Sequence, residues 1–425
     1  MLITFFMVLQ TNGVISEDEI REALCHTLSC VDKPLRKVLL LPPDYTRLYS
    51  GAGTITKILY QLLSPNCQID VMPALGTHVP MSQQECNDFF EGVVPYEKLI
   101  VHHWRDDVIK IGEVPAAFVS EVSEGLVCEA INVEVNKLLL DPSYDLIVSI
   151  GQVVPHEVVG MANYSKNIFV GCGGASMINA SHMLGAFYGM ERIMGKDFSP
   201  VRRVFDYAQE HFLQDLPLLY ILTCTTNTQG RTNLHGLYIG NNRSIFEQAV
   251  AQSQKTNIIH LEHPLQTCVV YLDPREFKST WLGNKAIYRT RMAIADGGEL
   301  IILAPGIERF GEDPEVDRLI RKYGYVGRQR ILELVKTEPE LRANLSVAAH
   351  LIHGSSDGRF RITYCTKALT EKQVRSVGFS YLPYDTAQAR YPLRSCKDGF
   401  CKIADQTVFY ISNPALGLWD ADLNQ

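Results

Sequence analysis

The sequence predicts an α/β fold with largely parallel sheets, on three observations. Short apolar runs bounded by Gly, Pro or Asp alternate with longer amphipathic segments, which is the pattern of strands alternating with helices. The chain has 425 residues, of which 46% are hydrophobic and 20% charged, so its composition is that of a globular protein. At about 100–200 residues per domain, this length predicts two or three domains.

The first part of the chain repeats the strand-and-helix unit. A helix is expected over 55–63, and polar residues such as Asp44, His78 and His156 follow the expected strands. Because ligands of open α/β sheets bind beyond the carboxyl ends of the strands, we expect these polar clusters to face one crevice. The apolar runs predict strands at residues 38–41, 69–74, 99–102 and 146–150.

The second part of the chain shows the same alternation. We expect a helix that begins after Asn179, with His182 in its first turn, and a long helix over 285–295 that stops at Gly297 and Gly298. The pattern is interrupted near Pro264, which predicts a first domain over 1–266 and a second over 267–404. A return of the tail, about 405–425, to the first domain is left open. Further strands are expected at residues 220–224, 237–240, 268–272, 300–304, 360–364 and 408–411.

Charge and cysteine usage exclude several classes of protein. The 47 acidic and 40 basic residues give a net charge of -7 without long like-charge runs, so nucleic acid is not an expected partner. No segment approaches the ~20 apolar residues that a membrane span needs, so no membrane partner is expected. The eleven cysteines are scattered without a CxxC pair, which favours reduced structural thiols in a cytoplasmic protein.

Several residues after the predicted strands have the chemistry of a binding or catalytic site. Asp44-Tyr45-Thr46-Arg47 combines a carboxylate, a hydroxyl and a guanidinium, which suits a phosphate or carboxylate ligand. From residue types alone, the nearby imidazoles and amine could serve metal binding, acid/base chemistry or anchoring of a cofactor. Zinc is the first metal to consider, but the only short His pair, His102-His103, points to opposite faces of a strand. The imidazoles and the amine belong to His78, His156, Lys166 and His182.

Taken together, these motifs resemble the nickel-pincer lactate racemase family. The resemblance rests on Asp44-x-Thr46-Arg47, Gly76-x-His78-x-Pro80, Pro155-His156, Lys166 and His182, in that order and at those spacings. It extends along nearly the whole chain, with support from 285–288 and 297–302.

The resemblance implies two α/β domains with Rossmann-like sheets and a cofactor in the cleft between them. That cofactor is a nickel-pincer nucleotide, Ni(II)-pyridinium-3,5-bisthiocarboxylic acid mononucleotide. By motif position, His182 would bind the nickel and Lys166 would tether the cofactor, while the loop Asp44–Arg47, with Tyr45 and Thr46, would lie against it. Separate biosynthetic enzymes would be its partners in loading.

The implied activity is an isomerase that racemises or epimerises a small 2-hydroxy acid. His78 and His156 match the two acid/base histidines, one for each face of the substrate. Deprotonation of the 2-hydroxyl would drive hydride transfer to the cofactor through a flat 2-keto acid, and the hydride could return to either face. An imidazole with an ordinary pKa near 6.5 suits this proton exchange at neutral pH.

The sequence departs from the family at the substrate-binding helix. Lactate racemases carry Tyr-Gln-x-x-Lys there, whereas this chain reads Tyr288-Arg289-Thr290-Arg291-Met292. Arg289 could replace the missing cation from one turn earlier, and Arg47 and Tyr288 complete the expected substrate contacts. We therefore expect a 2-hydroxy acid other than lactate, with a second carboxylate or polar substituent.

Two other functions remain open at this stage. One is a catalytically silent carrier or sensor that binds the cofactor without turnover. The other is a metal-dependent hydrolase or lyase that uses the same histidines. The identity of the substrate and the oligomeric state are not predicted by the sequence.

Overall fold

The computed structural model of the protein describes residues 6–228, 230–392, 396–403 and 405–421. The chain separates into two compact units. The first takes in residues up to Tyr188 together with Ile193–Asn257, and the second takes in Gly189–Arg192 together with residues from Ile258 onward. Each unit is built around its own six-stranded sheet.

The sheet of the first unit is parallel at its centre and antiparallel at one edge. Strands β9, β6, β2 and β3 run parallel to one another, and β10 and β1 are added antiparallel to β9. The apolar runs that predicted strands at 38–41 and 146–150 form β2 and β6. In spatial order the strands are β1 (Phe6–Gln10), β10 (Arg231–Gly240), β9 (Leu218–Thr228), β6 (Leu146–Gln152), β2 (Lys37–Leu41) and β3 (Gln68–Val71).

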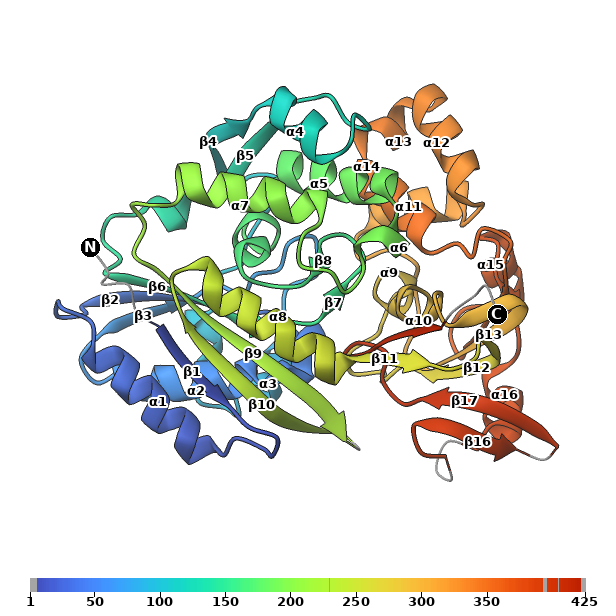
Figure 1. Cartoon of the computed structure of the whole chain (residues 1–425), viewed down its shortest axis with the longest axis horizontal. Coiled ribbons are helices and arrows are strands. Elements are labelled where there is room, and N and C mark those ends of the chain that lie inside the picture. The colour runs from blue at the N-terminus through green and yellow to red at the C-terminus, as the bar shows by residue number, and fades with distance from the viewer. Residues whose placement is uncertain (1–5, 229, 393–395, 404, 422–425) are drawn as a thin grey trace. The chain divides into compact units, whose positions relative to one another are not determined.

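Helices cover both faces of this sheet, as Figure 1 shows with α1 and α2 on one side and α5 and α7 on the other. The burial of β2 explains why both faces need a cover. Val38 and Leu40 pack into one apolar cluster, and Leu39 and Leu41 pack into another, because successive side chains of a strand point to opposite faces. The helices are α1 (Glu17–Ser29), α2 (Ala52–Leu63), α3 (Gln83–Phe89), α4 (Ala116–Val122), α5 (Ala175–Tyr188), α7 (Pro200–Phe212) and α8 (Arg243–Asn257).

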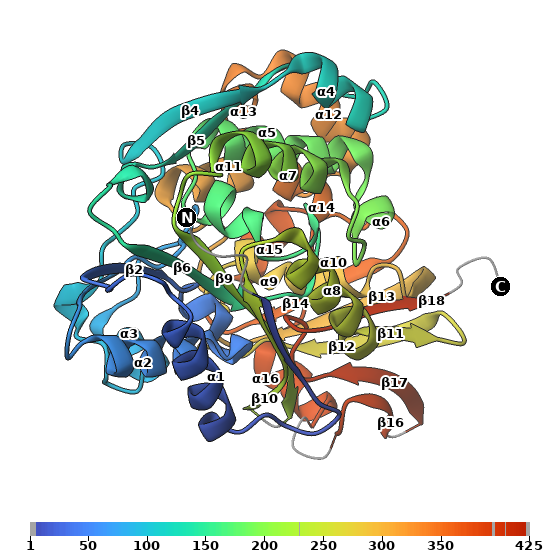
Figure 2. The ribbon, with the colours of Figure 1, turned by 60° about the vertical axis from the view of Figure 1, so that its left-hand side comes forward.

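Shorter elements complete the first unit. The hairpin of β4 (Val108–Val114) and β5 (Ile131–Asn136) packs against α5 and α7 on their side away from the six-stranded sheet (Figure 2). A second small hairpin joins β7 (Pro155–His156) to β8 (Gly160–Met161). The remaining short helices are η1 (Tyr45–Ser50), η2 (Tyr96–Lys98), η3 (Lys137–Leu140) and the π-helix η4 (Asn167–Gly171).

The sheet of the second unit is parallel except at one edge strand. β15, β14, β13, β12 and β17 are parallel neighbours, and β16 is antiparallel to β17. A separate parallel pair joins β11 to β18. The strands are β11 (Ile258–Leu261), β12 (Leu265–Tyr271), β13 (Ile294–Ala304), β14 (Arg361–Thr366), β15 (Ser380–Tyr381), β16 (Gly399–Ile403), β17 (Gln406–Ile411) and β18 (Leu418–Ala421).

Helices connect the parallel strands of the second unit, as the alternating pattern of this part of the chain predicted. Tyr384 and Ala387 of α16 pack against Val269, Ile301 and Leu303 of the sheet. The helices are α6 (Met190–Ile193), α9 (Thr280–Gly283), α10 (Lys285–Thr290), α11 (Pro314–Tyr323), α12 (Arg328–Thr337), α13 (Pro339–Ala343), α14 (Leu345–His353), α15 (Glu371–Ser376) and α16 (Tyr384–Arg390).

Three expected elements differ from the structure. Residues 99–102 form no strand, because only Leu99 makes a single bridge to Val71. The helix expected over 285–295 ends at Thr290, and Gly297 and Gly298 lie inside strand β13 rather than at a helix end. The helix that carries His182 begins five residues earlier than expected, so His182 lies in its interior.

The described part of the tail pairs within the second unit. Phe409 of β17 lies opposite Cys268, and Trp419 of β18 lies opposite Ile259. Residues 422–425 of the expected tail lie outside the described residues. In the parts of the chain that the structure describes, no helix combines the length and the apolar character needed to cross a membrane.

Candidate active site

The candidate site of the first unit lies beyond the carboxyl ends of three strands of its sheet. Strands β3, β2 and β6 are parallel neighbours, so their carboxyl ends lie side by side. Asp44 follows β2, His78 follows β3 and His156 follows β6. His102, at the end of the strand expected over 99–102, does not join them, because it is buried between the Gly173 carbonyl and the Asn136 amide.

Asp44 and His78 form a hydrogen-bonded pair. Asp44 caps helix η1, where one carboxylate oxygen accepts hydrogen bonds from the Thr46 amide at 2.8 Å and the Thr46 hydroxyl at 2.5 Å. Its other oxygen is 2.7 Å from His78 Nδ1. A carboxylate only accepts hydrogen bonds, so Nδ1 of His78 carries the proton and Nε2 of the neutral ring keeps its lone pair. The pair thereby presents a base at Nε2.

The electrostatics of Asp44 agree with this assignment. Burial raises the pKa of Asp44, but the charge of His78 and the hydrogen bonds from His78 and Thr46 outweigh burial, so its pKa is lowered overall. Asp44 is only 3% exposed, which makes its charge dependent on these partners. Asp44 therefore remains a carboxylate at neutral pH.

The other two members of the loop point in different directions. The Tyr45 ring is buried in the apolar cluster beneath the sheet, and its hydroxyl donates to Asp88 of α3 at 3.1 Å. Arg47 is half-buried, and its charge acts on the amine of Lys166. Arg47 thus belongs with the polar cluster, whereas the contacts of Tyr45 are those of a core residue.

Lys166 directly precedes the π-helix η4, an irregular helix type that occurs often at functional sites. Burial, and then the charge of Arg47, lower the pKa of Lys166 to about 8, against the opposite effect of Glu157 and Asp44. An amine with this pKa is partly neutral near physiological pH, and only the neutral form is a nucleophile. Lys166 therefore has the chemistry that a covalent tether requires.

The loop before Lys166 is held by a buried arginine. Arg202 of α7 has no exposed surface and donates to the Met161 carbonyl at 2.7 Å, the Asn163 carbonyl at 3.1 Å and the Ser165 hydroxyl at 2.7 Å. Asn163 and Tyr164 have φ angles of 68° and 56°, a left-handed conformation that costs free energy in residues other than glycine. Arg202 thus stabilises the loop before Lys166 in this conformation.

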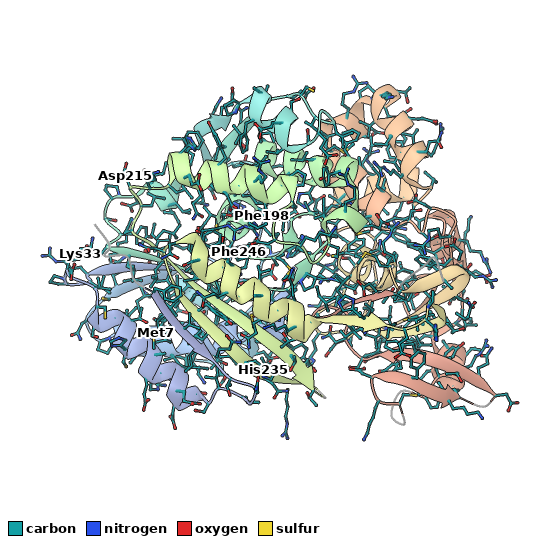
Figure 3. The ribbon with its side chains drawn as sticks, viewed as in Figure 1. Met7, Lys33, Phe198, Asp215, His235 and Phe246 are labelled. Atoms are coloured by element: carbon teal, nitrogen blue, oxygen red, sulfur yellow. The ribbon has the colours of Figure 1, made fainter. Side chains whose placement is uncertain are left out.

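Aromatic packing supports the same loop. The Tyr164 ring stacks on Phe246 with the centroids 5.2 Å apart, and the Arg202 guanidinium lies 4.3 Å from the Phe246 centroid. Figure 3 marks Phe246 on α8. The Tyr164 hydroxyl accepts a hydrogen bond from Gln209 at 2.5 Å. These contacts fix the residues on the amino side of Lys166.

His182 lies in the middle of α5 with one ring nitrogen already engaged. Its Nδ1–H donates to the Ile178 carbonyl at 2.7 Å, which leaves the lone pair of Nε2 for another partner. Burial lowers the pKa of His182 to about 4, so the ring is neutral at physiological pH. A neutral imidazole whose other nitrogen donates to a carbonyl is the usual form of a metal-binding histidine.

His156 is oriented by the turn that follows it. It lies in β7 and is 5% exposed, and its Nδ1 accepts a hydrogen bond from the Val158 amide at 3.1 Å. The turn needs glycine at Gly160, which has a φ of 86° and where a Cβ would lie 2.2 Å from the Lys196 carbonyl oxygen. The ring of His156 is therefore placed by backbone, unlike the ring of His78.

Glu157 is a site residue that the sequence analysis did not identify. Its Oε2 is 3.8 Å from His156 Nδ1, and its side chain is 15% exposed. Its charge raises the pKa of both Lys166 and His182. The available signal was an acidic residue next to a strand-end histidine.

The side chains of this group lie within reach of one another's charges. The charges of Arg47 and Asp44 act on Lys166, and those of Lys166 and His78 act on His182. A cavity of about 980 Å³ lies elsewhere: it includes the amino end of β9 at Leu218. Figure 3 marks two of its lining residues, Lys33 and Asp215. None of the predicted site residues lines it.

The predicted substrate residues Tyr288 and Arg289 belong to helix α10 of the second unit. The Tyr288 hydroxyl is 2.7 Å from His350 Nδ1. Arg289 has no exposed surface, and its Nη1 donates to the Gly417 carbonyl at 3.4 Å. Substrate binding by Tyr288 and Arg289, and the location of the site in an interdomain cleft, stay predictions.

Comparison with known proteins identifies the first unit more closely. Residues 12–194 match the family model of the lactate racemase N-terminal domain, and this range contains every candidate residue of the first unit. A curated relative, the lactate racemase of Thermoanaerobacterium thermosaccharolyticum, is 25% identical over 152 residues. The alignment covers 35% of this chain and 32% of that protein, so it spans about a third of the relative.

Two solved structures share the fold along nearly the whole chain. A crystal structure of a protein from Thermotoga maritima has a TM-score of 0.83 at 23% identity, and covers 97% of this chain and 100% of that chain. The lactate racemase apoprotein of T. thermosaccharolyticum has a TM-score of 0.66 at 16% identity, with coverages of 96% and 93%. The chain is thus a two-unit α/β protein. The match of residues 12–194 confirms its resemblance to the lactate racemase family.

Proposed function

We propose that the protein is a racemase or epimerase of a 2-hydroxy acid that uses a nickel-pincer nucleotide and a 2-keto acid intermediate. The observation that carries the proposal is the grouping of Lys166, His182 and the Asp44–His78 pair. The group lies in the part of the chain that matches the lactate racemase N-terminal domain. These residues combine a nucleophilic amine, an imidazole with one nitrogen available to bind a metal, and a base.

The side chains present fit the proposed cofactor. His182 offers a single lone pair at Nε2, which suits a metal whose other ligands belong to the cofactor. Lys166 offers an amine with a pKa of about 8 for a covalent bond, and Arg47 offers a cation for a phosphate or carboxylate. When bound, the nucleotide supplies a carbon that accepts and returns hydride.

The protein's own contribution is proton transfer and orientation. Nε2 of His78 takes the proton of the substrate 2-hydroxyl, while Nδ1–H of the same ring keeps its hydrogen bond to Asp44. The resulting imidazolium is therefore stabilised by a charge-assisted hydrogen bond. His156 exchanges the proton on the opposite face of the substrate. Arg47 binds the 2-hydroxy acid carboxylate, and the substrate contacts that we predict in the second unit are Tyr288 and Arg289.

The residues at the end of helix α10 in the second unit favour a substrate other than lactate. Where lactate racemases carry lysine, this chain carries Met292, and the neighbouring cations are Arg289 and Arg291. Arg291 is committed to structure, since its guanidinium pairs with Glu191 at 2.7 Å and donates to the Ser355 carbonyl at 3.1 Å. Of these two arginines, we therefore assign Arg289 to a second carboxylate or polar group of the substrate.

A metal-dependent hydrolase or lyase receives less support. Hydrolytic zinc sites use three protein ligands around one metal. Within the described residues, no group of three or more His, Cys, Asp or Glu side chains is arranged to hold a metal ion. All eleven cysteines are unpaired thiols, and five of them are buried. The silent carrier differs from the enzyme only in turnover, so the experiment below separates the two.

The test is a chiral screen on loaded protein. The protein is produced together with cofactor-making enzymes, its nickel content is measured, and a panel of single-enantiomer 2-hydroxy acids is analysed by chiral chromatography. We expect one nickel per chain and formation of the opposite configuration, with loss of exchange in His78→Ala and His156→Ala. His103→Ala, an exposed histidine, is the matched control.

Three results would count against the proposal. Loaded protein that exchanges no acid of the panel would favour the carrier. Active protein that contains zinc and no nickel would favour the hydrolase or lyase. Unchanged activity in both histidine variants would remove the proposed acid/base roles.

A further inference from the structure

Each of the two predicted acid/base histidines has a carboxylate near its Nδ1, but only one of the two pairs is joined by a hydrogen bond. His78 Nδ1 is 2.7 Å from Asp44, which is hydrogen-bond distance. His156 Nδ1 is 3.8 Å from Glu157 Oε2, beyond that distance, and accepts the Val158 amide proton instead. The two imidazoles are therefore held in different tautomers.

The contact with Val158 determines which atom of His156 carries a proton. Because Nδ1 accepts a hydrogen bond, it has no proton, and the neutral ring must carry its proton on Nε2. A ring in this state donates from Nε2 and has no lone pair there to accept a proton. His156 therefore acts as a base at Nε2 only after Nδ1 has gained a proton and Nε2 has lost its own.

Protonation of Nδ1 requires a new partner for it. An Nδ1–H group would face the Val158 N–H, and two donors repel each other. Glu157 is the carboxylate next to this atom, and closing 3.8 Å to about 2.8 Å would make a charge-assisted hydrogen bond. Its side chain is only 15% exposed, and its charge acts on Lys166 and His182, so the carboxylate lies within range of the other site residues.

We propose that Glu157 is the positioning residue of His156, which takes over Nδ1 from the Val158 amide during proton exchange. This inference rests on the proposed function. A proton from solvent binds Nδ1 and is held by Glu157, which gives an imidazolium. The Nε2 proton then passes to the keto oxygen of the intermediate, which leaves the neutral Nδ1–H tautomer. That tautomer accepts a hydroxyl proton at Nε2 in the reverse direction, so protons balance over a cycle.

The charges around this pair set the conditions of the exchange. Glu157 lies 3.8 Å from His156 in the same turn, and its charge acts on Lys166 at the start of η4 and on His182 of α5. Of these, Lys166 competes with His156 for the carboxylate when it is protonated. His182 is neutral at physiological pH because burial lowers its pKa to about 4.

The test uses the full chain without cofactor, labelled with ¹⁵N-histidine. Ring ¹⁵N shifts report the tautomer and the titration of each imidazole, and His156→Gln assigns the signals. We expect the Nε2–H tautomer for His156 at pH 8 and the Nδ1–H tautomer for His78. In Glu157→Gln the titration midpoint of His156 should fall by about one pH unit, a tenfold loss of proton affinity. Glu157→Asp should restore part of it.

Matched variants make the result specific. Asp44→Asn should move the signals of His78 and leave those of His156 in place, and Glu121→Gln, an exposed carboxylate on α4, should move neither. An unchanged His156 midpoint in both Glu157 variants, with the fold intact by circular dichroism, would overturn the proposal. A His156 resting tautomer with the proton on Nδ1 would also overturn it.

The activity measurement separates this proposal from the proposed function. If Glu157→Gln shifts the His156 titration but the loaded parent protein exchanges no 2-hydroxy acid, the proposed function fails and the Glu157–His156 pairing stands. If the parent exchanges an acid and Glu157→Gln leaves both the titration and kcat against pH unchanged, the role of Glu157 fails and the function stands.

Discussion

Replacing Lys166 by Met should stabilise the protein, because burial of the charged amine lowers the free energy of unfolding. The ordinary lysine pKa of 10.5 falls to about 8 in the folded protein, chiefly through burial. At about 1.36 kcal/mol per pKa unit, the folded state disfavours the ammonium by at most about 3 kcal/mol. Partial solvent exposure of the side chain screens this effect, so we expect about 2–3 kcal/mol of added stability at pH 7.

The pH dependence gives the prediction its sign. Below pH 8 the amine is charged in both the folded and the unfolded state, so the full cost is present. Between pH 8 and 10.5 the unfolded chain binds more protons than the folded one, and the cost declines as pH rises. The stability difference between Lys166→Met and the parent should therefore be largest at pH 7 and small at pH 10.5.

Urea unfolding of cofactor-free protein, followed by circular dichroism at both pH values, measures this difference. Lys98→Met replaces an exposed lysine of the same unit and is the matched control, expected within about 0.5 kcal/mol of the parent. Equal stabilities of the two variants at pH 7, or a difference that grows with pH, would refute the proposed cost of the buried amine.

Three further changes test other parts of the site. A double-mutant cycle of Asp44→Asn and His78→Gln should give a coupling free energy of about 1.5–3 kcal/mol at pH 7, and a value near zero would contradict the pair. Because the pKa of Asp44 is lowered in the folded state, its contribution is present above its unfolded value near about 3.9 and should be lost as pH falls below that value. His182→Ala, expressed with the cofactor-making enzymes, should retain no nickel by mass spectrometry, and stoichiometric nickel would show that another ligand is sufficient. Arg202→Met leaves three buried acceptors without their donor and should lower the free energy of unfolding in urea by about 3 kcal/mol or more. The exposed control Arg203→Met should stay within about 0.5 kcal/mol of the parent. Equal effects of the two variants would contradict the role of Arg202 in holding the loop before Lys166.

The parts of the fold predictable from sequence are those that local pattern determines. Buried parallel strands such as 38–41 and 146–150 are continuous apolar runs, and the polar residues after them had to meet at one edge once the strands were parallel. The helix over 285–295 could not be bounded in this way. Met292 bridges to Asp420, and β13 begins at Ile294, so a contact with a distant segment ends the helix at Thr290.

The candidate site was predictable in its motif residues but not in the residues that support them. Arg202 reads in sequence as half of a short basic pair, although the fold buries it and turns it onto the loop before Lys166. Glu157 becomes visible only when the hairpin of β7 and β8 directs its carboxylate toward His156. Such roles depend on tertiary packing, which has no local signature in the chain.

The fate of the α-hydrogen tests the central claim most directly. Nickel-loaded protein is given a single-enantiomer 2-hydroxy acid with a second carboxylate, labelled with deuterium at C2, in ordinary water. Hydride transfer predicts that the product of opposite configuration retains the deuterium at C2, because hydride does not exchange with solvent. A product that has lost the deuterium to water would contradict hydride transfer, and the absence of any configurational change across the substrate panel would contradict the proposed racemase.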